Sequence, residues 1–350
     1  MKRTALFLII TFLALPILLL PFKISIGKGL PAYSLTNLIQ NKGHGLANSL
    51  DSWFLKRLVF LPLLVRTKNE MLYQIGHSEE LIFGIDGYSA DRGTLEKIIP
   101  QVDEMTEEEM LVIAEKLSLL RDYLDTKGVF FIVCIVPYKT TKDFIPFNTG
   151  YLRKSFGIDR LQKNLIQKRV PFIDVLSSYR RTQNTHYKTD VHNNSVGKSI
   201  VQSDLLRRLH SEFSLPFVPK KMVDEVSWFE GANNNAMPKL FALGEYTIRR
   251  SAKGSPQFEN VYIKPVRTFK PKEKKDGRLP KTLMIGNSFM LGYEDLGLVD
   301  YFESFSRILD YTHFKNFENH LGDNKIVILH LYEGQISFHL NTPSYWPKIP

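Results

Sequence analysis

An eight-residue apolar run directly behind a capped helix is the feature that most constrains how this chain can fold. The run, from Val129 to Val136, holds only aliphatic and aromatic side chains and Cys134. Such a strand is typical of a parallel sheet, where both faces of a central strand are buried. The segment before it opens with the capping box Thr106 to Glu109. Apolar residues then recur at helical spacing, at Met110, Ile113, Leu117, Leu120 and Leu124.

Further helix and strand patterns follow in the same order along the chain. The helical patterns are 161–168, 195–209 and 302–309, and the apolar strands are 170–175, 282–285 and 325–331. Alternating helices and buried strands predict a three-layer α/β/α domain with a mostly parallel sheet, over residues 76–345. The stretch 220–280 is richer in Asn, Pro and Lys, which favours an insertion or a cap before the strand at 282–285.

The first 22 residues predict a membrane-spanning helix. An uncharged run from Ala5 to Phe22 follows Lys2 and Arg3, and its length of about 27 Å matches the hydrocarbon thickness of a bilayer. No small-x-small cleavage site follows, which favours a retained signal anchor over a cleaved signal peptide. The two cations predict that the N-terminus lies in the cytoplasm. Residues 23–75 then read as a tether and a membrane-proximal helix, for which packing on the domain is favoured over binding at the membrane surface.

Charge and cysteine content narrow the classes of partner. The formal net charge is +10, and the stretch 264–281 is strongly basic. We interpret this stretch as a solvated, partly flexible loop, with an anionic polymer or a lipid surface as its alternative partner. No nucleic-acid motif is present, so nucleic acid is not an expected partner. The single cysteine cannot form an intramolecular disulfide, so the fold does not depend on oxidation.

Two short segments carry the residue types of a serine acyl-transfer site. Ser288 follows the strand 282–285 after Gly286, at the carboxyl end of the predicted sheet, where open α/β sheets place their sites. Asp190 and His192 stand two residues apart in a loop before a helix. A carboxylate at this spacing can fix the imidazole tautomer and leave its other nitrogen for a serine. We therefore predict a nucleophile, a base and an orienting acid.

Each half of this pair has an ordinary structural alternative. A serine after a strand is often only a helix N-cap, and Asp190 and His192 could be a turn residue and a surface histidine. His186, Asp190 and His192 could also ligate a metal, but no further acidic or cysteine partner lies nearby in the sequence. The prediction is therefore a site without metal or other cofactor.

With these segments in this order, the chain resembles the alginate O-acetyltransferase family, SGNH-hydrolase-like proteins that acetylate polysaccharides. The resemblance covers roughly residues 75–340. It rests on the order Asp, His, Ser, since ordinary SGNH esterases have the serine first. The segments Val136–Thr141 and Leu329–Glu333 also resemble the family's Pro-x-Lys strand end and last strand. The chain departs from the family where Trp, Arg and Asp are usual, at Asn193, Gly334 and Asn287.

The resemblance implies an activity and a setting. Ser288 would form an acetyl-serine, with His192 as general base and Asp190 orienting it, and a hydroxyl of an exported polysaccharide would take the acetyl group. It also implies a polytopic membrane acyltransferase as acetyl donor. With the anchor, this predicts a single-pass inner-membrane protein whose catalytic domain faces the periplasm.

Weaker site candidates and rival functions complete the sequence prediction. Asn287, Lys139 and Tyr293 are candidates for oxyanion or substrate binding, with Phe289 as a second aromatic near the serine. A lysine after a strand end is usually a solvated loop residue, and an aromatic residue is more often core than substrate contact. The rival functions are an acetyl esterase of the same fold and a non-catalytic glycan-binding subunit of an export complex.

Overall fold

The computed structural model describes residues 61–78, 81–84, 88–140, 157–182, 184–230, 244–254, 258–273 and 276–348. The chain divides into two compact units, Met1–Gly76 with Met237–Ala242, and His77–Ala236 with Leu243–Pro350. Helix α4 (Leu61–Gln74) belongs to the first unit and falls inside residues 23–75, for which a tether and a membrane-proximal helix are predicted. Within the described ranges, no helix is long and apolar enough to cross a bilayer. The expected anchor, residues 1–22, lies outside those ranges.

A seven-stranded sheet forms the centre of the second unit, in the order β4-β3-β11-β9-β10-β8-β7. The first five strands run parallel to one another, and β8 and β7 extend the sheet as an antiparallel edge hairpin. The bounds are β3 Phe130–Val136, β4 Phe172–Ile173, β7 Phe258–Ile263, β8 Val266–Pro271, β9 Thr282–Ile285, β10 Phe305–Ile308 and β11 Ile326–Tyr332. The predicted mixed α/β class with a mostly parallel sheet is confirmed.

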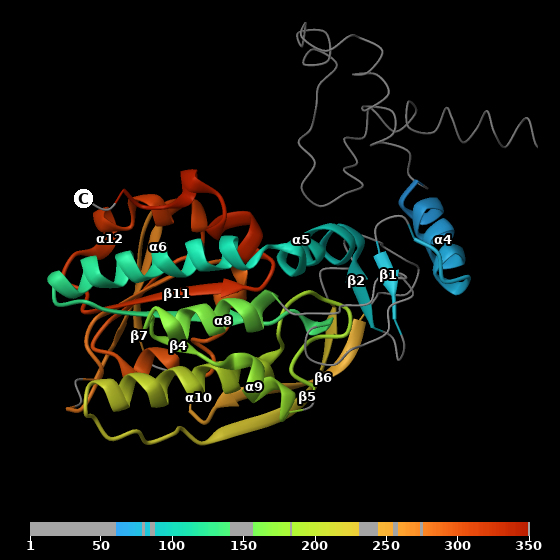
Figure 1. Ribbon diagram of the computed structural model, residues 1–350. Helices are drawn as coiled ribbons and strands as arrows, with labels where there is room; N and C mark the ends of the chain where they lie inside the picture. The colour runs from blue at the N-terminus through green and yellow to red at the C-terminus, as the bar shows by residue number, and fades with distance from the viewer. Residues whose placement is uncertain are drawn as a thin grey trace, which may run out of the picture. The chain divides into compact units, whose positions relative to one another are not determined.

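Helices cover both faces of this sheet. Alternate residues of β3 point into two separate cores, Phe131 and Val133 into one and Ile132 and Cys134 into the other. Helices α6 (Glu107–Thr126) and α8 (Gly157–Gln167) lie side by side on the first core (Figure 1). Helices α9 (Val175–Arg180) and α10 (Ser195–Glu212) pack on the second. The predicted layers follow from this alternation, because each apolar strand supplies two hydrophobic faces.

Helix α6 begins as its sequence predicts. The Thr106 side chain accepts a hydrogen bond from the Glu109 backbone, and the Glu109 carboxylate accepts one from the Thr106 backbone. All five residues of the predicted apolar face are buried against the sheet. The remaining small elements of this unit are β1 Leu81–Phe83, β2 Ser89–Asp91, η3 Thr94–Ile98, α5 Ile99–Glu104, η5 Leu298–Tyr301, η6 Tyr311–Asn316, α12 Glu318–Leu321, η7 Ile336–Leu340 and η8 Pro343–Tyr345.

The helix predicted at 302–309 is wrong, because β10 (Phe305–Ile308) occupies its centre. Phe302, Phe305 and Ile308 recur every third residue, which imitates helical spacing. All four residues of the strand are buried, including Arg307, whose guanidinium is paired with Glu294 at 2.8 Å. A charged residue inside a buried strand gives no apolar alternation, and that is why the pattern misleads.

The stretch 220–280 is divided between two places. Strands β5 (Met222–Glu230) and β6 (Gly244–Ala252) pair antiparallel as a separate two-stranded sheet, the β5–β6 ribbon. The later part forms β7 and β8, which belong to the central sheet. The basic stretch 264–281 is therefore not simply the expected solvated loop, because it contains a strand hydrogen-bonded to β10.

Gly286 is required by a close approach between neighbouring strands. A Cβ atom at this position would lie 2.1 Å from the His330 carbonyl oxygen of the neighbouring strand β11. Side-chain Cβ atoms do not approach oxygen this closely, so any larger residue must push the end of β9 away from β11. The end of β9 is what carries Ser288.

We expect Gly286→Ala to lower the free energy of unfolding by about 1–3 kcal/mol, the range for overpacking a rigid site. Urea unfolding of the purified chain measures it. The control is Gly93→Ala: Gly93 has helical backbone angles, φ −61° and ψ −41°, and its Cβ would meet only the Asp91 carboxylate at 3.3 Å. Equal stability of the Gly286→Ala variant and the wild type would contradict the close-approach explanation.

Candidate active site

Ser288 stands at the carboxyl end of the central strand β9, in the short turn η4 (Ser288–Met290). The strand is buried along its whole length, whereas the Ser288 side chain is exposed. Asn287 holds the turn, because its side-chain oxygen accepts a hydrogen bond from the Phe289 backbone at 3.1 Å. Among the described residues, none accepts a hydrogen bond from the Ser288 backbone N–H, so this donor can serve a ligand.

The loop between α9 and α10 carries Asp190 and His192. One oxygen of the Asp190 carboxylate accepts two hydrogen bonds from His192, from its backbone N–H at 2.9 Å and from ring Nδ1 at 2.6 Å. The first bond is the Asx turn that aspartate forms with the residue two positions on. Because of the two-residue spacing, the same Asp190 oxygen holds both the backbone and the ring of His192.

The second ring nitrogen of His192 reaches the serine. His192 Nε2 lies 2.8 Å from Ser288 Oγ, across 96 positions of sequence. Because the Nδ1–H group donates to the Asp190 carboxylate, Nε2 is left to accept the proton of the serine hydroxyl. The side-chain exposure rises from 6% at Asp190 to 25% at His192, and Ser288 is exposed. This Asp190–His192–Ser288 row has the geometry of an acyl-transfer site, with a buried carboxylate and an accessible nucleophile.

Phe289 packs behind the histidine rather than facing substrate. Its ring centroid lies 4.6 Å from that of His192, and its ring also stacks in parallel on that of Tyr332, with centroids 4.9 Å apart. Phe289 is 3% exposed. The ring therefore restrains the tilt of the imidazole, and the hypothesis that it stacks on a substrate is wrong because the ring is buried in the core.

Tyr293 is likewise a core residue. It is 3% exposed, and its hydroxyl lies 3.1 Å from Nε2 of His330. Burial lowers the pKa of His330 to about 3, so the imidazole is neutral and can accept the tyrosine proton. The suggestion that Tyr293 binds substrate is therefore corrected. A tyrosine five residues after the serine packs beneath the site because the chain turns back onto the sheet.

Lys139 is fully buried, so the expectation that it is a solvated loop residue is wrong. It is 0% exposed, and its ammonium group donates to three backbone carbonyl groups. These belong to Ser89 in β2, to Lys188 at 3.1 Å and to Asp190 at 3.0 Å. An ammonium group has three N–H donors, and all are used. Lys139 therefore ties the loop of Asp190 to β2 and to the end of β3.

The charge of Lys139 is stabilised only in part. Burial lowers the pKa of its ammonium group to about 7, while the carboxylates of Asp190 and Glu245 act to raise it. Glu245 lies in β6 and accepts hydrogen bonds from the Thr189 backbone at 2.9 Å and the Thr189 hydroxyl at 3.3 Å. Sequence analysis misses Glu245, because only strand pairing in the β5–β6 ribbon brings it to this loop.

His186 does not face Asp190 and His192 as a metal ligand would. Its ring Nε2 donates to the Pro137 carbonyl at 3.0 Å, which leaves Nδ1 to accept the Thr185 hydroxyl proton at 3.1 Å. Both nitrogens are therefore committed to protein partners. Within the described ranges, no group of three or more His, Cys, Asp and Glu side chains is arranged to hold a metal ion.

Asn193 and Asn194 close the base of this loop. Asn193, where the resembled family usually has tryptophan, is buried and donates to the Tyr179 hydroxyl at 2.9 Å. Asn194 caps α10 through the Gly197 backbone at 3.0 Å. A Cβ at Gly197 would lie 2.2 Å from the Thr185 carbonyl, so the glycine lets the two ends of the loop meet. The departure at Asn193 is thus structural and leaves the Asp190–His192–Ser288 row intact.

Comparison with known proteins identifies the fold. No protein-family model matches the chain, and no curated protein matches its sequence. A structure of Bacillus cereus PatB1 is similar at a TM-score of 0.54 and 16% identity, covering 70% of this chain and 94% of that chain. PatB1 with a sulfonyl adduct is similar at a TM-score of 0.57 and 14% identity, covering 77% and 100%.

A further similar structure is the O-acetyltransferase domain of Pseudomonas putida AlgJ. Its TM-score is 0.43 at 14% identity, covering 75% of this chain and 92% of that chain. The resemblance predicted from the sequence is thus confirmed as a likeness of fold, which the PatB1 structures carry.

Removal of the Lys139 charge tests its place in this site. The native pKa is about 7, and that of an unfolded lysine is about 10.4, so the unfolded chain binds one more proton between these values. The Lys139 contribution to the free energy of unfolding therefore rises with pH across this window, by at most about 1.4 kcal/mol per pH unit. We expect Lys139→Met to be destabilised at every pH and to lack this rise.

Urea unfolding of both proteins across the window measures the difference. The gap between wild type and Lys139→Met should widen as the pH increases. The control is Lys163→Met, at an exposed position of α8, whose curve should run parallel to that of the wild type. A constant gap for Lys139→Met would mean that Lys139 keeps an ordinary lysine pKa in the folded protein.

Proposed function

We propose that the protein is an O-acetyltransferase that moves an acetyl group through an acetyl-serine on Ser288 to a hydroxyl of an exported polysaccharide. The observation that carries the proposal is the Asp190–His192–Ser288 row, with its bonds of 2.6 and 2.8 Å and its exposed serine. The fold shared with PatB1 is compatible with it. A serine that only capped a turn would not need a histidine with a fixed tautomer.

The chemistry follows from the positions of the protons. Ser288 Oγ attacks the acetyl carbonyl carbon while its proton passes to His192 Nε2, and the charge of Asp190 stabilises the imidazolium that forms. The Ser288 backbone N–H donates to the developing oxyanion. Collapse expels the leaving group, which takes the proton from His192, and leaves acetyl-serine. A polysaccharide hydroxyl then attacks the acetyl carbonyl carbon and gives its proton to His192. Collapse of this second intermediate expels Ser288 Oγ, which takes the proton back from His192, and the acetylated sugar leaves.

The setting of the reaction is part of the proposal. Residues 1–22 anchor the protein in the inner membrane, with the catalytic domain in the periplasm and a polytopic membrane acyltransferase as acetyl donor. The charge-free run behind Lys2 and Arg3 supports this placement. The donor partner accounts for how acetyl groups arrive where acetyl-CoA is absent, and the anchor keeps the domain beside it.

A carbohydrate acetyl esterase is the second candidate. The exposure of Ser288 favours it, because water can reach an acetyl-serine at that position. The two functions share every step up to the acyl-enzyme and differ only in which hydroxyl attacks it. A non-catalytic glycan-binding subunit would form no acyl-enzyme at all.

Ser288 is expected to be the single site of reaction with a sulfonyl fluoride or an activated acetyl ester. The choice of probe follows the sulfonyl adduct of PatB1. Intact-mass spectrometry of the purified chain should show one adduct, absent from Ser288→Ala and present in Ser211→Ala, which removes an exposed serine of α10. An acetyl adduct that discharges faster to a glycan than to water identifies a transferase, and discharge to water alone identifies the esterase. Folded protein without any adduct would exclude both enzymes.

Asp190→Asn should abolish most turnover while the fold persists. Asparagine keeps an oxygen for the His192 backbone but removes the charge that holds Nδ1–H and stabilises the imidazolium, so acylation should slow roughly 10³- to 10⁴-fold. The control is Asp174→Asn, which retains a good N-cap for α9. Stopped-flow release of p-nitrophenol from its acetate measures the acylation rate. A change below tenfold would place the Asp190 charge outside the reaction.

A further inference from the structure

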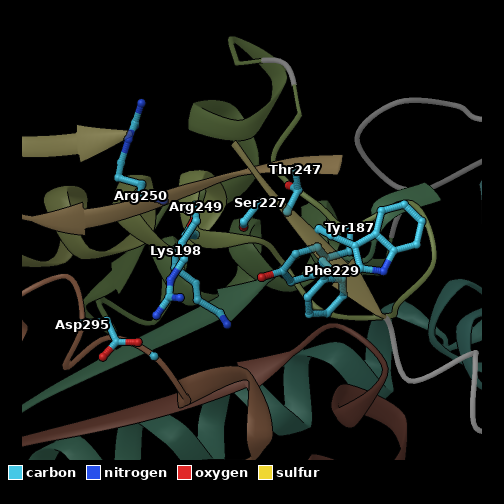
Figure 2. Close-up of a pocket in the computed structure, with 11 residues that line it drawn as sticks. Tyr187, Lys198, Ser227, Phe229, Thr247, Arg249, Arg250 and Asp295 are labelled. Atoms are coloured by element: carbon cyan, nitrogen blue, oxygen red, sulfur yellow. Dashed lines mark hydrogen bonds between the residues drawn. The ribbon is translucent and has the colours of Figure 1, made fainter. Parts of the chain in front are cut away.

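A pocket of about 270 Å³ opens beside the loop of His192, on the side covered by the β5–β6 ribbon. Figure 2 shows its lining, which has an aromatic part with Tyr187 and Phe229 and a cationic part with Lys198 and Arg249. The Asp190–His192–Ser288 row is not part of the lining. The pocket is therefore a separate place that a larger substrate could occupy while it reaches the serine.

Hydrogen bonds fix this pocket to the loop that holds the reacting groups. The Tyr187 backbone donates to the His192 carbonyl at 3.2 Å. On the ribbon side, the Ser195 hydroxyl donates to the Ile248 carbonyl at 2.9 Å and accepts from the Arg250 backbone at 2.7 Å. Gly292, four residues after Ser288, lies against Lys198, since a Cβ there would be 3.7 Å from the Lys198 Nζ. A sugar chain in the pocket would thus be adjacent to both halves of the site.

Two of the three cations that line the pocket are available to a ligand. Arg250 is committed to Asp224, with two bonds of 2.7 Å, and points away from the other two in Figure 2. Among the described residues, no acceptor or carboxylate is hydrogen-bonded or ion-paired to the Lys198 ammonium or the Arg249 guanidinium. Both side chains extend toward the same part of the pocket, near Asp295 (Figure 2). One carboxylate against two cations leaves a positive excess.

The Lys198 amine is in an environment that an added anion would relieve. Burial lowers its pKa below the usual value, while the carboxylates of Asp190, Glu294 and Asp295 act to raise it, although none of the three is ion-paired with it. A cation that has lost part of its hydration and has no direct partner is costly. A carboxylate or phosphate group between Lys198 and Arg249 would supply the missing charge-assisted hydrogen bonds.

The aromatic part of the pocket suits a sugar ring. Tyr187 stacks on Phe229 with centroids 3.6 Å apart and planes 12° apart, which fixes a rigid aromatic step next to the cations. Trp228 adds a half-exposed indole from the same strand. Ligand sites combine such apolar surfaces with a few placed polar groups, and rigid aromatic rings lose little entropy on binding.

We propose that this pocket binds an anionic sugar unit of the acceptor polysaccharide, with the acid group between Lys198 and Arg249 and the ring against Tyr187 and Phe229. The acceptor role rests on the proposed acetyl transfer, whereas the binding does not. The shared chemistry is a sugar with a negative group, which is a carboxylate in uronic acids and a phosphate in phosphosugars. The site would favour such chains over neutral glycans, because a neutral sugar leaves both cations unpaired.

The test uses the full chain with Ser288→Ala, so that binding is read without turnover. Isothermal titration calorimetry compares short oligogalacturonides with the same oligomers methyl-esterified, which removes the charge of each carboxylate and adds one methyl group. We expect the ester to bind about tenfold more weakly or worse, the scale of one lost charge-assisted bond. Glucuronate and glucose 6-phosphate then compete with the oligomer, to distinguish a carboxylate from a phosphate as the preferred anion. Stronger competition by glucose 6-phosphate would assign the anion as phosphate.

Variants of the pocket complete the experiment. Arg249→Gln changes an exposed position of the ribbon, and Lys198→Gln removes the partly buried cation; each should weaken oligogalacturonide binding about tenfold. Arg207→Gln, which removes a 67% exposed arginine of α10, should leave it unchanged. Equal binding of acid and ester, or pocket variants that bind like Arg207→Gln, would overturn the proposal. If the Ser288→Ala chain binds the acid but wild-type Ser288 forms no adduct with the activated ester, the acetyl-transfer function fails and the anionic site stands.

Discussion

The three bonds of the Lys139 ammonium group are the interaction on which the arrangement of this site depends. Lys139 follows the central strand β3, and its bonds connect the Asp190 loop to that strand and to β2. Two further contacts support the same connection, from the Ser89 backbone N–H to the Lys188 carbonyl at 2.8 Å and from His186 Nε2 to the Pro137 carbonyl at 3.0 Å. A buried charge is costly to hold. It is tolerated here because each of its three N–H donors meets a backbone carbonyl group.

That connection makes the distance between histidine and serine a property of the sheet. Ser288 follows β9, Lys139 follows β3, and both strands pair with β11 in fixed parallel register. The close approach of Gly286 to the His330 carbonyl keeps the end of β9 against β11. Residues that are distant in sequence thus depend on the same strand for their position. A hydrogen bond of 2.8 Å between His192 and Ser288 needs this rigidity, because a reacting pair misplaced by an ångström loses most of its rate.

Local rules made much of this predictable. Asp190 and His192 form a ring of bonds that their spacing alone permits, and Ser288 is recognisable because a buried strand ends just before it. The capping box of α6 and the two-sided strand β3 are equally local, and they were sufficient for the layered fold. Short segments of the sequence are therefore sufficient to predict these three residues as the reacting groups.

The parts that the sequence does not reveal are those decided by partners far along the chain. Whether Lys139 is solvated or buried depends on carbonyls some fifty positions away on both sides. From its sequence position Tyr293 could contact substrate, but in the folded chain it lies in the core beneath the turn of Ser288. The sequence of strand β10 resembles a helix because Arg307 interrupts its apolar pattern, and Arg307 is buried only because it pairs with Glu294. In each case the deciding energy comes from tertiary contacts that override local preference.

The β5–β6 ribbon links the two functions proposed for this region. Glu245 at one end of β6 holds Thr189, next to Asp190, while Arg249 and the backbone of Ile248 and Arg250 line or brace the pocket. Burial raises the pKa of Glu245 above its usual value, while the hydrogen bonds that it accepts from the Thr189 loop act to lower it. A ligand that tightens the ribbon against α10 would therefore also tighten the loop that aligns His192. Binding of the acceptor and alignment of the base would then share one structural element, so an acceptor in the pocket would favour transfer to itself over loss of the acetyl group to water.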